Sequence, residues 1–126
     1  MRRLLLLALL ALPAWGQTPT YADVAYASPS SLDTQKLDVY HPSGCGAGPY
    51  PVMMLMTGGG TSGGGREEFL GGANGAPITQ AILSRCWAVA AISYRRLTPM
   101  WPTDLHDCKA AVRFLKANAG TYSLNA

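Results

Sequence analysis

Charged side chains are scarce in this sequence, which narrows the partners it can have. Only 13% of its 126 residues are charged, with ten basic and seven acidic side chains and a net charge of +3. Arg2 and Arg3 belong to a predicted leader, and without them the net charge is near +1 (8 − 7). No basic stripe remains to neutralise a row of phosphates, so nucleic acid is not expected as a partner.

Histidine and cysteine are also few, and their spacing does not favour a metal site. The two histidines, His41 and His106, lie far apart in sequence and do not cluster with the cysteines, which form no C-x-x-C pair. In an exported protein the three cysteines could form disulfides. For Cys45, Cys86 and Cys108 we expect plain packing or one surface bridge.

What the sequence does contain begins with a leader pattern. Two arginines precede an apolar run over residues 4–12, and Ala14 and Gly16 place small residues where signal peptidase reads. The run is too short to span a membrane. We interpret residues 1–16 as a signal peptide and 17–126 as one domain. The protein is therefore expected to be secreted or periplasmic, with no membrane span after cleavage.

The remaining chain predicts an α/β layered domain. Hydrophobic residues make up 48% of the sequence, enough to bury a core. Apolar and alternating runs predict strands at residues 33–40, 51–57 and 87–94, and helical periodicity predicts helices at 77–85 and 103–119. We expect Thr103 to cap the second helix. The order of these elements favours a mostly parallel central sheet flanked by helices.

A glycine-rich loop over residues 58–75 follows the second predicted strand and satisfies two functional patterns. The first is the dinucleotide fingerprint G-x-G-x-x-G, but no helix opens at its third glycine and no acidic residue follows the next strand. The second is the nucleophile elbow G-x-S-x-G around Ser62, but an elbow needs a strand that passes directly into a helix. Asp104 and His106 also lie on different sides of a helix, so they cannot act as an oriented acid–base pair.

An oxyanion hole fits the context of this loop better. Glycines after a buried strand present backbone N–H groups without side chains in the way. Fixed N–H donors stabilise the negative oxygen that develops in acyl transfer. A flexible surface loop without a chemical role stays open as the alternative on the residues alone.

Four segments together resemble the N-terminal part of α/β-hydrolase esterases. They are residues 36–42 (KLDVYHP), 51–60 (PVMMLMTGGG), 90–95 (AAISYR) and 101–119 (WPTDLHDCKAAVRFLKANA), in the family's order and spacing. The similarity is to the hormone-sensitive-lipase-like and the feruloyl- or acetyl-esterase-like families. It implies a serine esterase that acts on small-molecule or polysaccharide-linked esters and needs no cofactor.

The resemblance also assigns the residues of the loop. The oxyanion donors would be the backbone N–H groups of Gly59 and Gly60, and Gly58 would shape the turn. Thr57 stands where the family has a histidine that buttresses the loop. The family's nucleophilic serine, acid and histidine lie beyond the matching segment. We therefore expect this chain to stop before the nucleophile elbow and to be inactive alone.

Other residues receive structural roles. The resemblance pairs Arg95 with Asp107 as an ion pair, and His106 is expected to face solvent. Met100 and Trp101 are expected to line an acyl pocket or to pack beside neighbouring prolines. Two other functions stay open: a degenerate, non-catalytic hydrolase-like binding module, and part of a prolyl-oligopeptidase-type peptidase, which shares the fold.

We expect signal peptidase to cleave after Gly16, because the small residues of the leader end there. The exported protein should then begin at Gln17. N-terminal sequencing of the exported protein tests this expectation, and a mature N-terminus found elsewhere would refute it.

Overall fold

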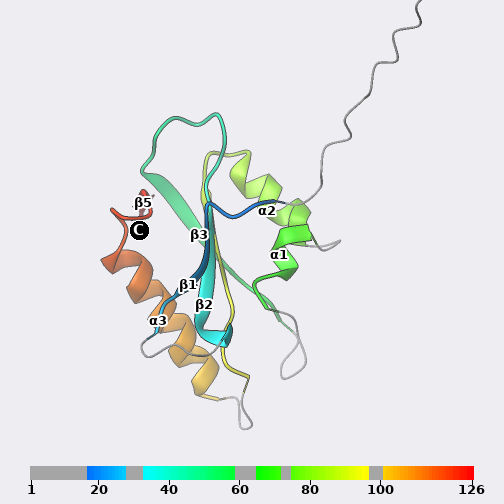
Figure 1. Ribbon diagram of the computed structural model, residues 1–126, viewed down its shortest axis with the longest axis vertical. Coiled ribbons are helices and arrows are strands. Elements are labelled where there is room, and N and C mark those ends of the chain that lie inside the picture. Colours follow the sequence, from blue (N-terminus) through cyan, green and yellow to red (C-terminus); the bar gives the residue numbers. More distant parts are fainter. Residues whose placement is uncertain (1–16, 28–32, 59–64, 72–74, 97–100) are drawn as a thin grey trace, which may run out of the picture.

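A five-stranded sheet with helices packed against it forms the framework of the protein (Figure 1). The computed structural model describes residues 17–27, 33–58, 65–71, 75–96 and 101–126. In chain order the elements are β1 (Tyr21–Ala25), the 3-10 helix η1 (Asp33–Gln35), β2 (Lys36–Tyr40), β3 (Tyr50–Met56), α1 (Glu68–Gly71), α2 (Gly75–Leu83), β4 (Ala88–Ile92), α3 (Thr103–Ala117) and β5 (Leu124–Asn125).

The sheet is mixed, with strand order β1-β2-β4-β3-β5. β1 pairs with β2 and β2 with β4 in antiparallel fashion, whereas β3 pairs in parallel with both β4 and β5. The prediction of a mostly parallel sheet is therefore wrong for the described strands, while helices do pack against the sheet as expected. Parallel neighbours need a crossover connection. The segment with α1 and α2 supplies it between β3 and β4, and the segment with α1, α2, β4 and α3 supplies it between β3 and β5.

β4 lies at the centre of the core, and every one of its residues is fully buried. Ala88, Ala90 and Ile92 point to the face that α3 covers. The two residues between them point to the opposite face, where α1 and α2 pack (Figure 1). This alternation follows from the two-residue repeat of a strand, and it explains why the sequence of β4 is apolar throughout.

The predicted elements are found with shifted ends. The strand expected at residues 33–40 is divided into η1 and β2, and α1 lies inside the region expected to be a glycine loop over 58–75. Thr103 is the first residue of α3 and not its cap. The N-cap position is Pro102, and among the described residues no side chain caps this helix.

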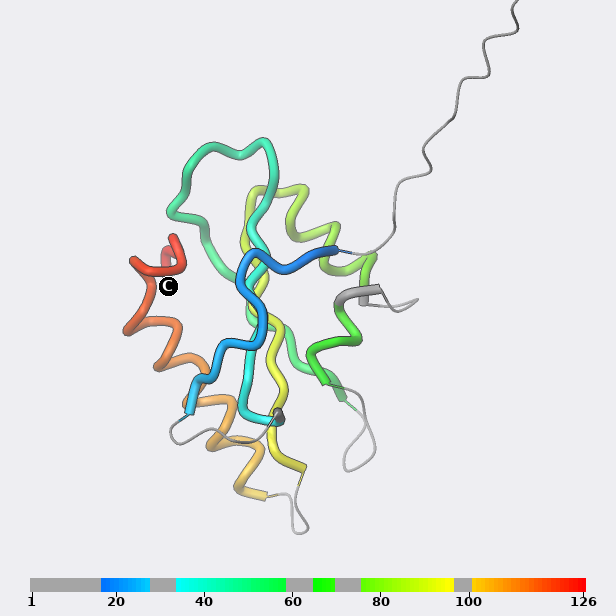
Figure 2. The backbone as a smooth tube through the Cα atoms, viewed as in Figure 1, coloured from blue at the N-terminus to red at the C-terminus, as the bar shows by residue number. Residues whose placement is uncertain are grey.

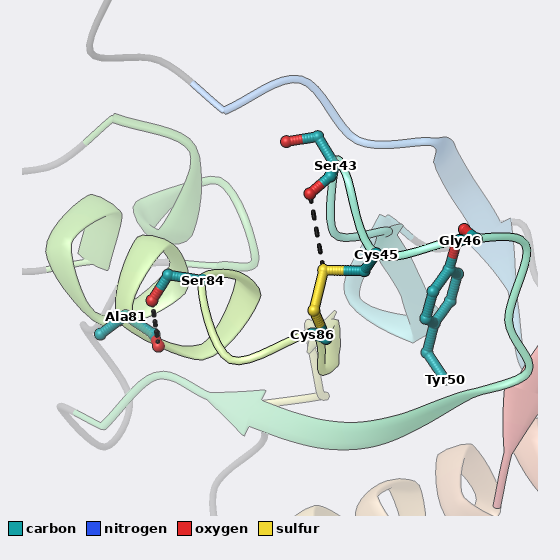
Figure 3. The surroundings of a disulfide bond; sticks show 7 residues. All are labelled: Ser43, Cys45, Gly46, Tyr50, Ala81, Ser84 and Cys86. Atoms are coloured by element: carbon teal, nitrogen blue, oxygen red, sulfur yellow. Dashed lines mark hydrogen bonds between the residues drawn. A yellow bond between two sulfur atoms is a disulfide. The ribbon is translucent and has the colours of Figure 1, made fainter.

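A disulfide joins Cys45, in the turn before β3, to Cys86, in the turn after α2 (Figure 3). The two Cα atoms are 5.5 Å apart, and the cysteines are separated by 41 residues in sequence. The bond therefore connects the segments that precede the N-terminal ends of the parallel strands β3 and β4. Cys108, on α3, is a free thiol. The expectation of one surface bridge is confirmed.

The predicted signal peptide at residues 1–16 and its cleavage site after Gly16 lie outside the described residues. Within the part of the chain that the structure describes, no helix is long and apolar enough to cross a membrane.

Replacing Cys45 with alanine should lower the free energy of unfolding by about 4 kcal/mol, because a bridge across 41 residues restricts the unfolded chain. Urea denaturation under non-reducing conditions measures the loss. Dithiothreitol should destabilise the wild type by a similar amount and leave Cys45→Ala unchanged. The matched control is Cys108→Ala, which should respond to dithiothreitol as the wild type does. Equal stability of the oxidised and reduced wild type would contradict the bridge.

Candidate active site

The candidate site lies where the parallel strands β3 and β4 end. Met56, the last residue of β3, is level with Ile92, the last residue of β4. Thr57 and Gly58 follow the first strand, and residues 93–96 follow the second. In open α/β sheets, ligands bind outside the carboxyl ends of the parallel strands. The sheet thus brings the start of the glycine loop next to the segment that leaves β4.

Thr57 is buried, with 5% of its surface exposed, and two residues that follow β4 hold it. The Tyr94 hydroxyl donates a hydrogen bond to the Thr57 carbonyl oxygen at 2.6 Å, and Arg96 Nη2 donates to Thr57 Oγ1 at 3.1 Å. The Arg96 guanidinium also lies over the Tyr94 ring, 5.3 Å from its centroid. These contacts fix both the backbone and the side chain of the residue that precedes the glycine loop.

The far end of the glycine loop is anchored by Arg66, of which only 3% is exposed. Its Nε donates to Oδ1 of the buried Asp38 at 3.1 Å, and it also forms an ion pair with Asp23. Arg66 Nη1 lies 3.3 Å from Glu67 Oε1. The Arg66 backbone N–H and Nη1 both donate to Ser93 Oγ, at 3.0 and 3.2 Å. Both described ends of the loop are therefore bound to the segment after β4.

Gly65 allows this close approach. A Cβ atom at this position would lie 3.0 Å from Ser93 Oγ, the oxygen that accepts two hydrogen bonds from Arg66. A larger residue at this position would have to displace both Ser93 Oγ and the end of the Glu67 side chain. Gly58, at the near end, is exposed. The predicted oxyanion donors Gly59 and Gly60, and the serine of the formal elbow pattern, Ser62, lie outside the described residues.

Asp107 forms the predicted ion pair with Arg95, and its side chain is almost fully buried on α3. Arg95 Nη2 lies 2.7 Å from Asp107 Oδ1, and the Arg95 backbone N–H donates to Oδ2 at 2.8 Å. Arg95 Nε also donates to both carboxylate oxygens, and Gln35 Nε2 adds a donor from a second residue at 3.2 Å from Oδ1. Burial by itself raises the pKa of Asp107, but the hydrogen bonds from Arg95 and Gln35 outweigh it and leave that pKa below its usual value. The pair ties the segment after β4 to α3.

Other residues singled out in the sequence take no part in this arrangement. His106 is exposed, as expected, and among the described residues it has no hydrogen bond with Asp104. Trp101 is 68% exposed, and Met100 and Pro99 lie outside the described residues. Within the same part of the chain, no cluster of three or more histidine, cysteine or acidic residues could hold a metal ion.

Comparison with known proteins decides the family. The family model named BD-FAE matches residues 37–126, which is well over half of the chain. The chain belongs to the BD-FAE family. Members are α/β-hydrolase-like esterase domains, so the expected resemblance to esterases is confirmed at this level. A comparison with curated proteins finds no match.

Two solved structures of larger proteins are similar to the BD-FAE chain. One is described as a truncated form of a carbohydrate esterase from gut microbiota, with a TM-score of 0.68, 28% identity and coverage of 87% of this chain. The other is described as a bifunctional GH43-CE protein of Bacteroides eggerthii, with a TM-score of 0.59, 27% identity and coverage of 82%. The chain spans 39% of the first protein and 13% of the second.

Replacing Asp107 with asparagine should lower the free energy of unfolding at pH 7 by about 2 to 3 kcal/mol, because it leaves Arg95 without its counter-charge. The cost stays at the low end since the Arg95 side chain is 33% exposed and partly solvated. Urea denaturation at pH 7 measures it. Asp104→Asn, in the first turn of the same helix, is the matched control and should have a smaller effect.

The same pair predicts a pH dependence. The pKa of Asp107 is lowered in the folded protein, so its stabilising effect is complete above the unfolded pKa of about 3.9 and is lost as the pH falls through the lower folded pKa. The stability difference between the wild type and Asp107→Asn should therefore shrink between about pH 5 and pH 2. A difference that stays constant over this range would contradict the ionised pair.

Proposed function

We propose that this chain supplies the oxyanion-hole half of a secreted serine carboxylic-ester hydrolase whose substrates are esters linked to carbohydrate. The family match and the carbohydrate esterases among its structural neighbours support the reaction class and the substrate class. The assignment of the oxyanion-hole half to this chain rests on one observation, which is that β5 runs parallel to β3.

β5 begins a parallel strand at the open edge of β3. Leu124 pairs with Tyr50 and Asn125 with Pro51, so the last residues lie beside the entrance of β3 (Figure 2). A strand that continued in this register would become level with Met56 about four residues after Ala126. A turn at that point would present its first side chain beside Thr57 and the glycine loop. This is the position in which a nucleophile elbow presents its serine.

The surface of β3 supports such a continuation. Parallel strands are normally buried on both faces, yet Met53 and Met56 of β3 are 41% and 45% exposed. On the face of β3 that also carries Met56, a groove of about 330 Å³ lies between β3 and α3, lined by Val52, Met54 and Val112 among others. Further strands and helices at this edge would cover both surfaces.

In the proposed reaction, Oγ of the serine forms a bond to the ester carbonyl carbon while a histidine takes its proton. The electron pair of the carbonyl moves to its oxygen, and the backbone N–H groups of Gly59 and Gly60 donate hydrogen bonds to it. Gly58 shapes the turn, and Thr57 takes the place of the buttressing histidine. The alcohol leaves with the proton from histidine, and water then releases the acid. None of these steps needs a cofactor.

Export is part of the proposal. The leader pattern of residues 1–16 predicts it, and the disulfide between Cys45 and Cys86 agrees with it, because such bonds persist in oxidising compartments outside the cytosol. The second candidate function is a non-catalytic binding module of hydrolase ancestry. Its support is the threonine at position 57, where catalytic relatives are expected to have histidine.

The DNA downstream of the Ala126 codon distinguishes the two candidates. The register of β5 predicts codons for G-x-S-x-G within about ten residues, in frame or behind a single frameshift. An intact elbow there supports the hydrolase, and a downstream sequence without one supports the binding module.

The purified 17–126 chain should not hydrolyse p-nitrophenyl acetate, because it lacks the serine, the acid and the base. A spectrophotometric assay at 405 nm, calibrated against the uncatalysed rate, measures this. Activity that survives purification and disappears in Ser62→Ala, but not in the control Ser84→Ala, would contradict the proposal and would make Ser62 the nucleophile.

A further inference from the structure

Arg96 differs from the other two arginines that lie near the ends of β3 and β4. Arg66 and Arg95 are both bound to carboxylates. The contacts of Arg96 are with neutral groups, the Thr57 hydroxyl and the Tyr94 ring. No carboxylate among the described residues forms an ion pair with Arg96, and its Nε is buried there without a hydrogen-bond partner.

This arrangement leaves a positive charge that the described residues do not balance. Arg96 is half-buried, so its guanidinium keeps only part of its hydration, and proteins often pair such a charge with an anion. The contacts with Thr57 and Tyr94 hold the Arg96 side chain in one orientation, so little side-chain entropy remains to be lost when a ligand binds. The planar fork of a guanidinium matches a carboxylate through two parallel hydrogen bonds.

We propose that Arg96 binds the carboxylate of the substrate, and that this carboxylate belongs to an acidic sugar, such as a uronic acid, next to the ester. The inference rests on the proposed function, because only an ester site at the glycine loop would bring a sugar to Arg96. The location of Arg96 supports it, since its Nη2 lies 3.1 Å from Thr57, the residue directly before Gly58. Arg96 is thus a substrate-binding residue that selects acidic carbohydrate.

A second source of the same chemistry is the acid that ester hydrolysis releases, which is also a carboxylate. The two sources differ in what else must be present: the acidic sugar carries the charge on its ring, and the released acid carries no sugar. Sodium glucuronate and sodium acetate therefore distinguish them, and methyl glucoside, a neutral sugar, controls for recognition of the ring alone.

Binding of these three probes to the purified 17–126 chain can be measured by titration monitored with NMR. Glucuronate should bind more tightly than acetate or methyl glucoside, and Arg96→Gln should weaken it about tenfold. Arg96→Lys keeps the charge without the fork and should weaken it less. Arg85→Gln is the matched control, because Arg85 is an exposed arginine outside the site at the end of α2 and should leave binding unchanged.

Glucuronate binding that is equal in the wild type, Arg96→Lys and Arg96→Gln would overturn the proposal. Acetate binding as tight as glucuronate would overturn the assignment to an acidic sugar. Because no probe is hydrolysed, these results do not depend on a nucleophile. A missing elbow downstream of Ala126 would therefore count against the hydrolase alone, whereas absent glucuronate binding with an intact elbow would count against the role of Arg96 alone.

Discussion

The parallel pairing of β3 with β4 is the constraint on which the rest of the described structure depends. Its register runs from Val52 opposite Ala88 to Met56 opposite Ile92. Because β4 is buried on both faces, a slip by one residue would move each of its side chains to the wrong helix layer, so the register is strongly specified. The disulfide connects the segments at the N-terminal ends of the two strands, and the contacts around Thr57 connect the segments at their C-terminal ends. The candidate site thus lies at the C-terminal end of a strand pair that is cross-linked at both of its ends.

The four residues after β4 hold the parts of the candidate site together. In order, residues 93–96 bind Arg66, the Thr57 carbonyl oxygen, Asp107 and the Thr57 hydroxyl. Successive side chains of an extended chain point to opposite sides, which lets one short segment reach both the glycine loop and α3. Both described ends of the loop are consequently positioned by the strand next to it. A loop that is rich in glycine needs such external anchors, because its own side chains provide few contacts.

The sequence predicts the elements of this fold better than it predicts their pairing. The apolar run of β4 and the helical periodicity of α3 are local signals, and both elements are found. The antiparallel half of the sheet has no such signal, since β1 is short and largely exposed and its partner is chosen by contacts far along the chain. The site divides in the same way. Motif order identified Thr57 and the pair of Arg95 with Asp107, whereas Arg66 reaches Asp38 across 28 residues and belongs to no motif.

The threonine at position 57 bears on whether the site is functional or degenerate. The family's histidine is expected to support the loop through side-chain hydrogen bonds, and a shorter residue alone could not replace it. Here the same support comes from the partners, because Tyr94 holds the Thr57 carbonyl oxygen and Arg96 holds its hydroxyl. The contact with the Thr57 hydroxyl places the Arg96 guanidinium beside the start of the loop. The residue that precedes the glycine loop is therefore held through both its backbone and its side chain, which is the support that the proposed oxyanion hole requires.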